Sequence, residues 1–474
     1  MKLIYGVKDR PGFGKTLLFA FQQLLAILAA TILVPALVGH DMSQSAALFG
    51  AGVGTLVYLL FTKFRSPVFL GSSFAFIGPM GAAFAGGVSM SLGYLGLLIG
   101  AGMAGLVYVI IALIVKFSGV KWINKIMPAV VIGPTVAIIG LSLSGNAIAN
   151  SFGKGVPQEY YHVGPTGNGL NVLICIAIAL ITLLTVVICS VYGKKMAKMI
   201  PFIIGIVVGY IIAAIVTVIG NAAGVEAMKI IDFSAFANMK WLPDFTFLTA
   251  FKGGYTFGES GSMASYILKI AIAYVPVAFV VFAEHLADHK NISSIIEKDL
   301  LEDPGLHRTL LGDGIGSMAG AFFGGCPNTT YGESIGCVAI SGNASVVTIL
   351  TTSILAIVAA FIAPFTTFLA TIPVCVMGGV CISLYGFIAV SGLKMIQKVD
   401  LGDNHNLFVV SVILIAGVGG MVIHFSRFEI ELTNIACALI LGIITNLILS
   451  GKKKAGTEEA IEEKVEEASE EKKD

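Results

Sequence analysis

The chain has 474 residues, of which 56% are hydrophobic and only 12% are charged, and its mean hydropathy is +0.92. These values exceed those of ordinary soluble domains and predict an integral membrane protein. The formal net charge is +1, and the sequence shows neither a basic patch nor the ligand spacing of a zinc site, so we expect no nucleic-acid partner and no metal. The seven cysteines are odd in number and lie in or beside apolar segments, which argues against a disulfide framework.

Apolar segments of helical length follow one another along the chain. The first, residues 17–37, is too long for a signal-peptide core and is predicted to be a retained first span. Later runs approach the roughly 20 residues that a helix needs to cross about 30 Å of hydrocarbon. We predict fourteen spans, centred near residues 27, 52, 75, 103, 137, 180, 210, 277, 316, 336, 354, 381, 415 and 440.

The spans centred near residues 75 and 336 are interrupted. They contain "PVFLGSSFAFIGP" and "GGCPNTTYGES", whose Gly, Pro, Ser and Thr residues break a helix inside hydrocarbon. Pro67 precedes the sequence Ser-Ser-Phe that ends at Phe74, and Pro327 precedes Thr-Thr-Tyr, which ends at Tyr331. Because interrupted spans in corresponding positions of two halves mark binding sites near the bilayer midplane, we expect a site between these two segments.

Loop charges predict the orientation. With fourteen spans and a cytoplasmic N-terminus, most loop lysines and arginines face the cytoplasm, and the exceptions are Lys154, Lys229, Lys240, Lys252, Lys269 and Arg427. An odd error in the span count would scatter the basic residues over both faces. We therefore expect a multi-pass protein of the cytoplasmic membrane with both termini in the cytoplasm.

The chain divides into five parts. Residues 1–14 form the cytoplasmic N-terminus, 15–220 a first seven-span repeat, 221–262 a less apolar extracellular linker, 263–450 a second seven-span repeat, and 451–474 a charged, solvated cytoplasmic tail. Because seven is odd, the two repeats have opposite topology in the membrane, as in inverted-repeat transporters. The interrupted spans are then the third in each repeat.

Two carboxylates stand at the end of an apolar run in "YVPVAFVVFAEHLADHKN", residues 274–291. If a helix spans Lys269 to His289, Glu284 lies about 7 Å from the midplane at about 1.5 Å per residue. A carboxylate inside the membrane is a functional candidate by default. Asp288 lies on the same helix face, and a pair of mutually repelling carboxylates suits proton coupling. The alternative is that the helix slides and both groups reach the cytoplasmic interface. His285 and His289 lie on other faces, where a structural or interfacial role is expected.

Glu333 is the third candidate, inside the interrupted segment "NTTYGES". Irregular backbone exposed to lipid would leave unsatisfied amides that cost several kcal/mol each, so this segment must be buried in protein or line a cavity. The helix ends created by the interruptions have free N–H groups for a substrate carbonyl. Together with two carboxylates that accept N–H bonds, and with Phe74 and Tyr331 as ring contacts, they suit a small cyclic diamide. Ordinary packing is the alternative for the two aromatic residues.

The segments "LGSSFAFIGP", "FAEHLADHKN", "DPGLHRTLLGDG" and "PNTTYGESIG" resemble the nucleobase-ascorbate transporter family, in its bacterial uracil permease branch. The resemblance covers nearly all of residues 8–450. It implies fourteen spans in two inverted repeats, with a core domain (spans 1–4 and 8–11), a gate domain (spans 5–7 and 12–14) and short extended segments in spans 3 and 10. It also implies a homodimer formed through the gate domain.

For the site, the resemblance implies that Glu284 and Glu333 hydrogen-bond uracil. Backbone groups at Phe74 and Gly332 and packing from Ala30 and Tyr331 complete the implied set. Coupling to the proton gradient is implied as well, with no other cofactor.

Two positions depart from the family pattern. Asp288 stands where the best-known uracil permeases carry a proton-coupling histidine, so either Asp288 or Glu284 is the candidate proton carrier. Ser334 stands where "TTYGEN" has Asn, which should alter affinity more than the type of reaction.

The sequence thus predicts a proton-coupled uracil symporter. A xanthine or other purine carrier on the same fold is the first alternative. An anion channel or carrier is a second, although two buried glutamates oppose an anionic ligand. A membrane-embedded enzyme is a third, although we find no nucleophile with a placed base.

Overall fold

The structure is a computed structural model that describes residues 3–153, 169–194, 196–425 and 430–450. Its first half contains α1 (Phe13–Val38), α2 (Gln44–Phe61), β1 (Leu70–Ser72), the short helix η1 (Phe74–Phe76), α3 (Ile77–Phe84), α4 (Met90–Ser118), α5 (Lys121–Ile126), α6 (Ala129–Ser142), α7 (Ser144–Ser151), α8 (Gly169–Tyr192), α9 (Met196–Met199) and α10 (Pro201–Ala223). The predicted charged tail, residues 451–474, lies outside the described residues.

The connecting segment contains η2 (Glu226–Met228), η3 (Phe233–Asn238), α11 (Thr246–Ala250) and η4 (Gly258–Ser260). The second half contains α12 (Met263–Ile296), η5 (Leu301–Gly305), α13 (Leu306–Gly324), β2 (Asn328–Thr330), α14 (Gly332–Ser341), α15 (Val346–Ala359), α16 (Ala363–Ala370), α17 (Val374–Ile396), α18 (Asn404–Val418), β3 (Ile423–Phe425), β4 (Ile430–Leu432) and a last helix, Asn434–Ser450. Each of the fourteen predicted span centres falls inside one of these helices.

The chain is a helical membrane protein. In the described ranges, eight helices are long and apolar enough to cross a membrane, and a ninth span forms if α15 and α16, which are bent by 84°, count as one. The remaining predicted spans are shorter helices, or, in α13, a helix whose apolar run is diluted by polar residues and glycines. Hydropathy and length therefore account for most of the predicted spans but do not by themselves account for all fourteen.

The two interrupted spans meet inside the protein. β1 and β2 pair as antiparallel strands, with Leu70 opposite Thr330 and Ser72 opposite Asn328. Both strands are fully buried, so the ladder satisfies backbone groups that have no access to water. The expectation of extended segments in these two spans is confirmed, and each strand leads directly into a short helix, η1 and α3 in one case and α14 in the other.

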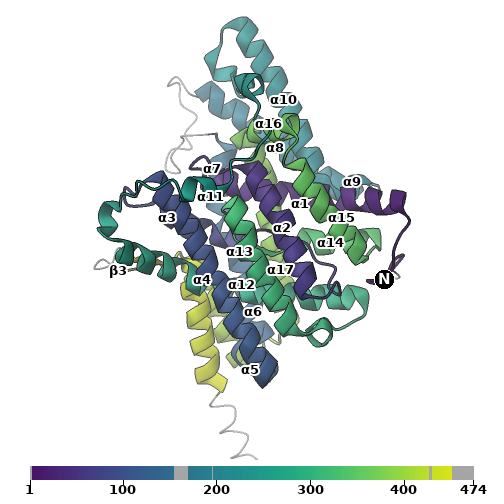
Figure 1. Ribbon diagram of the computed structural model, residues 1–474, viewed down its shortest axis with the longest axis vertical. Coiled ribbons are helices and arrows are strands. Elements are labelled where there is room, and N and C mark those ends of the chain that lie inside the picture. The colour runs from purple at the N-terminus through teal and green to yellow at the C-terminus, as the bar shows by residue number, and fades with distance from the viewer. Residues whose placement is uncertain (1–2, 154–168, 195, 426–429, 451–474) are drawn as a thin grey trace, which may run out of the picture.

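The helices pack as two groups. In the first, α2 and α4 contact α13, α12 contacts α4, and α15 contacts α1 and α2; Figure 1 shows α2, α13, α12 and α4 crossing the middle of the molecule. In the second, α17 contacts α6, α7, α8 and α10, and α18 contacts α6. Helices from both halves of the chain are thus interleaved in each group.

Contacts between loops occur at two ends of the molecule. At one end, the N-terminal segment pairs with the turn after α14, where Ile4 N donates to Gly342 O at 2.7 Å and Ala344 N to Tyr5 O at 2.9 Å. At the other end, the turn after α3 contacts both the segment before α12 and α12 itself: Glu259 N donates to Gly86 O at 2.9 Å, and Lys269 Nζ, in α12, donates to Ala85 O at 3.1 Å.

Two elements differ from the sequence expectation. α12 begins six residues before Lys269 and ends seven residues after His289, so the predicted bounds of this helix were too short. It starts where the Ser262 hydroxyl accepts a hydrogen bond from Ser265 N and ends where Glu297 adopts a left-handed conformation. The antiparallel β3–β4 pair was not predicted.

Candidate functional site

The site begins at the junction of the two strands. Tyr331 N donates to Phe69 O, and Ser73 N donates to Pro327 O at 2.9 Å, so hydrogen bonds continue beyond the ladder at both ends. Phe74 is the first residue of η1, and Gly332 and Glu333 open α14. No side chain in the described part of the chain caps either helix start. Their first-turn N–H groups are therefore available to a ligand.

Gly71 and Tyr331 explain why the strands can approach so closely. A Cβ atom at Gly71 would lie 2.3 Å from the Tyr331 ring, a contact that no real Cβ tolerates. The Tyr331 hydroxyl donates to Ser72 O at 2.8 Å. Tyr331 is buried, and this ring serves to lock β1 against β2, which favours the packing alternative for this residue.

Open space lies in front of Gly332. A Cβ added there would meet no atom within 4 Å, and Gly332 is exposed although both strands beside it are buried. Glu333 is partly exposed. An exposed glycine at a helix start inside a broken span fits the close approach of a ligand to the backbone.

Glu284 and Asp288 face this junction from α12. Thr330, the last residue of β2, donates from its hydroxyl to Asp288 Oδ2 at 2.7 Å. Glu284 lies one turn earlier on the same face, and both carboxylates are partly exposed. Because α12 continues eight residues beyond Asp288 to Ile296, Asp288 does not stand at the end of its helix. The structure thus brings Glu284, Asp288 and Glu333 together around the end of β2.

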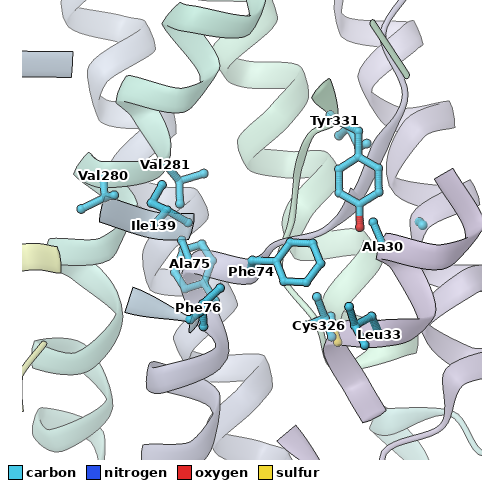
Figure 2. Close-up of a cluster of buried hydrophobic side chains, with 14 of the residues drawn as sticks. Ala30, Leu33, Phe74, Ala75, Phe76, Ile139, Val280, Val281, Cys326 and Tyr331 are labelled. Atoms are coloured by element: carbon cyan, nitrogen blue, oxygen red, sulfur yellow. The ribbon is translucent and has the colours of Figure 1, made fainter. Parts of the chain in front are cut away.

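Phe74 and Ala30 complete the set of predicted residues. Ala30 is buried in α1, and Figure 2 shows it near Tyr331 with Phe74 beside them. The rings of Phe74 and Tyr385 form a T-shaped contact, with centroids 5.5 Å apart and planes at 81°. Tyr385 belongs to α17, which packs with the second helix group. Tyr385 was not predicted to lie at the site, because nothing in the local pattern of α17 marks it.

Ser334 has a defined role in the structure. Gln23 of α1 donates from Nε2 to the Ser334 hydroxyl and, at 3.2 Å, to Ser334 O, and Phe69 N donates to the same hydroxyl at 3.2 Å. The first turn of α14, which carries Glu333, is therefore tied to α1 and to the residue before β1. Gln23 was not predicted, since it lies 311 residues from its partner.

His285 and His289 are absent from this junction. Both are fully buried, on a neighbouring face of α12 about 100° around the helix from Glu284 and Asp288. His285 Nδ1 lies 2.6 Å from Asp313 Oδ2, and His289 Nε2 lies 2.8 Å from the Tyr58 hydroxyl. The structural interpretation of the two histidines fits these contacts, whereas an interfacial position does not.

Comparisons with known proteins agree with these observations. A family model described as the Permease family matches residues 14–425. The uracil permease of Bacillus caldolyticus is 39% identical over 459 residues, which cover 96% of each chain. The uracil permease of Escherichia coli (strain K12) is 35% identical over 445 residues, which cover 94% of this chain and 93% of that one.

Solved structures show the same fold at low identity. The transmembrane domain of the cyanobacterial bicarbonate transporter BicA gives a TM-score of 0.59 at 17% identity and covers 94% of this chain and 100% of its own. The murine Slc26a9 anion transporter gives 0.59 at 13% identity, over 94% and 69%. At such identities the likeness concerns the fold alone. The family resemblance of the motifs is confirmed: the chain belongs to the Permease family and is a multi-pass membrane transporter, not an enzyme.

Proposed function

We propose that this protein is a proton-coupled uracil importer of the cytoplasmic membrane. The observation that carries the proposal is the gathering of Glu284, Asp288 and Glu333 around the end of β2, beside the open space at Gly332. The relatives named uracil permease, which align over more than nine-tenths of the chain, support uracil as the substrate.

The chemistry of the junction suits uracil. A cyclic diamide offers two N–H donors and two carbonyl acceptors. Glu284 and Glu333 accept the N–H groups, and the uncapped N–H groups at the starts of η1 and α14, near Phe74 and Gly332, donate to the carbonyls. The Phe74 ring and the Ala30 surface pack against the base. In this proposal Tyr331 contributes by holding the strands together.

Fourteen spans in two inverted repeats form the frame of this proposal. Loops that share a side in the fourteen-span arrangement contact one another: the N-terminus meets the loop after span 10, and the loop after span 3 meets the segment before span 8. The arginine and lysine that bind Asp303, Arg65 and Lys298, come from the loops after spans 2 and 8. These pairings support the predicted sharing of sides by the loops, and the distribution of loop lysines and arginines supports a cytoplasmic position for both termini.

The two helix groups correspond to the proposed core and gate. The first group contains spans 1–4 and 8–11 and carries the three carboxylates, and the second contains spans 5–7 and 12–14 and carries Tyr385. Movement of the core against the gate would expose the site alternately to the two sides. Asp288 is the proposed proton carrier, with Glu284 as the other candidate, and a homodimer through the gate is part of the proposal.

Uptake into proteoliposomes tests this function. Purified protein should accumulate labelled uracil when an inward proton gradient is applied, and a protonophore should abolish the accumulation. Excess unlabelled uracil should compete, whereas xanthine should not. Accumulation of labelled xanthine in place of uracil would instead establish the purine alternative, and chloride or sulfate currents without uracil uptake would establish an anion carrier.

A further inference from the structure

A polar stripe runs along one face of α13. It consists of Thr309, Asp313 and Ser317, which follow one another at intervals of four residues and so lie on one side of the helix. All three side chains are buried, with exposed fractions of 0%, 1% and 6%. Polar groups at such depth in a membrane protein are costly unless they are bonded, so their partners indicate what the stripe does.

The first partner is α12. His285 lies between two members of the stripe, with Nδ1 2.6 Å from Asp313 Oδ2 and Nε2 3.0 Å from Thr309 Oγ1. Both ring nitrogens are therefore occupied, and the imidazole has one orientation. Because successive residues of a helix are separated by about 100°, fixing His285 also fixes the direction of its neighbour Glu284 and of Asp288, one turn later.

The second partner is β2. Asn328, its first residue, donates its backbone N–H to Ser317 Oγ at 2.9 Å, and its side-chain amide donates to Gly50 O of α2 at 3.2 Å. The amide fills the space between α2 and α13, since a Cβ at Gly320 would lie 2.2 Å from Asn328 Nδ2. β2 leads within three residues to Gly332 and Glu333.

A second contact holds α12 beside α2. His289 Nδ1 donates to His285 O at 2.8 Å, and Nε2 lies 2.8 Å from the Tyr58 hydroxyl. The two imidazole rings are stacked with centroids 4.0 Å apart. The orientation of α12 is thus fixed over one full turn, from His285 to His289.

We propose that Asp313 and Ser317 are positioning residues of the uracil site: the stripe on α13 holds α12 and β2 at the spacing at which Glu284 and Glu333 bind one base. Asp313 acts through His285, and Ser317 acts through Asn328. Neither residue touches the substrate. This inference rests on the proposed function, because it concerns the geometry of the same site.

Equilibrium binding of labelled uracil to purified full-length variants tests the proposal. Asp313→Ala should weaken uracil binding by about tenfold or more, because His285 loses the partner that fixes α12. Asp313→Asn should restore binding to within about threefold of the wild type, since its amide offers a donor and an acceptor in the same place. Ser317→Ala should weaken binding by about three- to tenfold.

Two threonine variants add a milder change in the stripe and a matched control. Thr309→Val removes the hydroxyl beside His285 Nε2 with little change of shape, and it should weaken uracil binding by about threefold. Thr135→Val is the matched control, because the Thr135 hydroxyl is buried and bonds to Val131 O in its own helix. It should leave binding unchanged.

A merely structural role predicts a different pattern. If Asp313→Ala lowers the melting temperature of the ligand-free protein but binds uracil within twofold of the wild type, the proposal is wrong. If Asp313→Ala does not fold, the melting temperature and uracil binding of Thr309→Val and Ser317→Ala decide whether the proposal holds. Binding within twofold of the wild type in both variants would show that it is wrong. If the wild type binds another base but not uracil, the proposed substrate is wrong and the role of the stripe is still open to test. Binding of that base to the variants would then be measured in the same way.

Discussion

Two neighbouring faces of α12 both carry ionisable residues, but the two sets differ in exposure and in partners. One face presents Glu284 and Asp288, which are partly exposed at the junction of the broken spans. The other presents His285 and His289, which are fully buried and bonded to Asp313, Thr309 and Tyr58. A polar residue inside the membrane is thus no sufficient sign of a binding site. Its exposure and its partners decide whether it serves the ligand or the scaffold.

The largest effect should follow from a change at Glu284, on the face of α12 that carries the partly exposed carboxylates. Glu284→Gln should weaken uracil binding by about 10- to 100-fold, because a carboxyl acceptor in a partly desolvated site is lost and an amide N–H is presented to the base. The melting temperature of the ligand-free protein should fall little. Isothermal titration calorimetry and ligand-free thermal unfolding measure the two quantities. Unchanged binding would remove Glu284 from the site.

Asp288→Asn separates binding from coupling on the same face. The amide can still accept the hydrogen bond from Thr330, so uracil binding should stay within about threefold of the wild type. Accumulation of uracil against its gradient should be lost, because the variant cannot take up and release a proton at this position. Proteoliposome uptake measured with and without a proton gradient checks this. Preserved uphill uptake would assign the proton to another group.

Tyr58→Phe tests the face of α12 that carries the buried His285 and His289. It removes the hydroxyl that bonds His289 and Ser66, both of which are fully buried, and should lower the free energy of unfolding by about 1–3 kcal/mol. Uracil binding should weaken by less than about threefold, because His285 still fixes the orientation of α12 through Asp313 and Thr309. Tyr108→Phe is the matched control, because the buried Tyr108 hydroxyl has no hydrogen-bond partner among the described residues. Thermal unfolding and uracil binding would be measured for both variants. Loss of uracil binding in Tyr58→Phe alone would show that the face with His285 and His289 also determines binding.

The smallest effect is expected at the surface, away from both faces. The hydrogen bonds from Lys298 and then Arg65 lower the pKa of Asp303 from its usual value near 3.8 to about 2. Because the folded pKa is the lower one, the stabilisation is present above pH 4 and is lost as the pH falls through about 2. These side chains are more than a third exposed, so the gain is small.

Asp303→Asn should therefore lower the melting temperature slightly at pH 7. The difference from the wild type should vanish as the pH approaches 2. A variant as stable as the wild type at pH 7 would show that solvent screens these ion pairs completely.

The sequence predicted the features that depend on local composition. Apolar runs located the helices, and the Gly, Pro, Ser and Thr content of two segments located the broken spans, because helix interruption in hydrocarbon has a local chemical cause. The sequence predicted a site between the two interrupted segments, but not that β1 and β2 pair as strands. The intramembrane carboxylates stood out for the same reason, since each is a polar residue in an apolar segment.

Contacts between distant residues could not be predicted in this way. Asp313 lies 28 residues from His285, and Gln23 lies 311 residues from Ser334. Nothing in the pattern around either residue names its partner. Asp313 and His285 meet because α13 and α12 both pack against α4, and Gln23 and Ser334 meet because α14 packs on α1. The length of α12 was underestimated because its last two turns are polar, and their burial depends on neighbouring helices.

The most direct test of the uracil site is the uracil-dependent rise in melting temperature of the wild type and of Glu333→Gln. A ligand that binds the folded state raises the midpoint in proportion to the logarithm of its concentration over its dissociation constant. We expect a concentration-dependent rise for the wild type, and little or no rise for Glu333→Gln at the same uracil concentrations. An equal rise for both proteins would contradict the placement of uracil between Glu284 and Glu333.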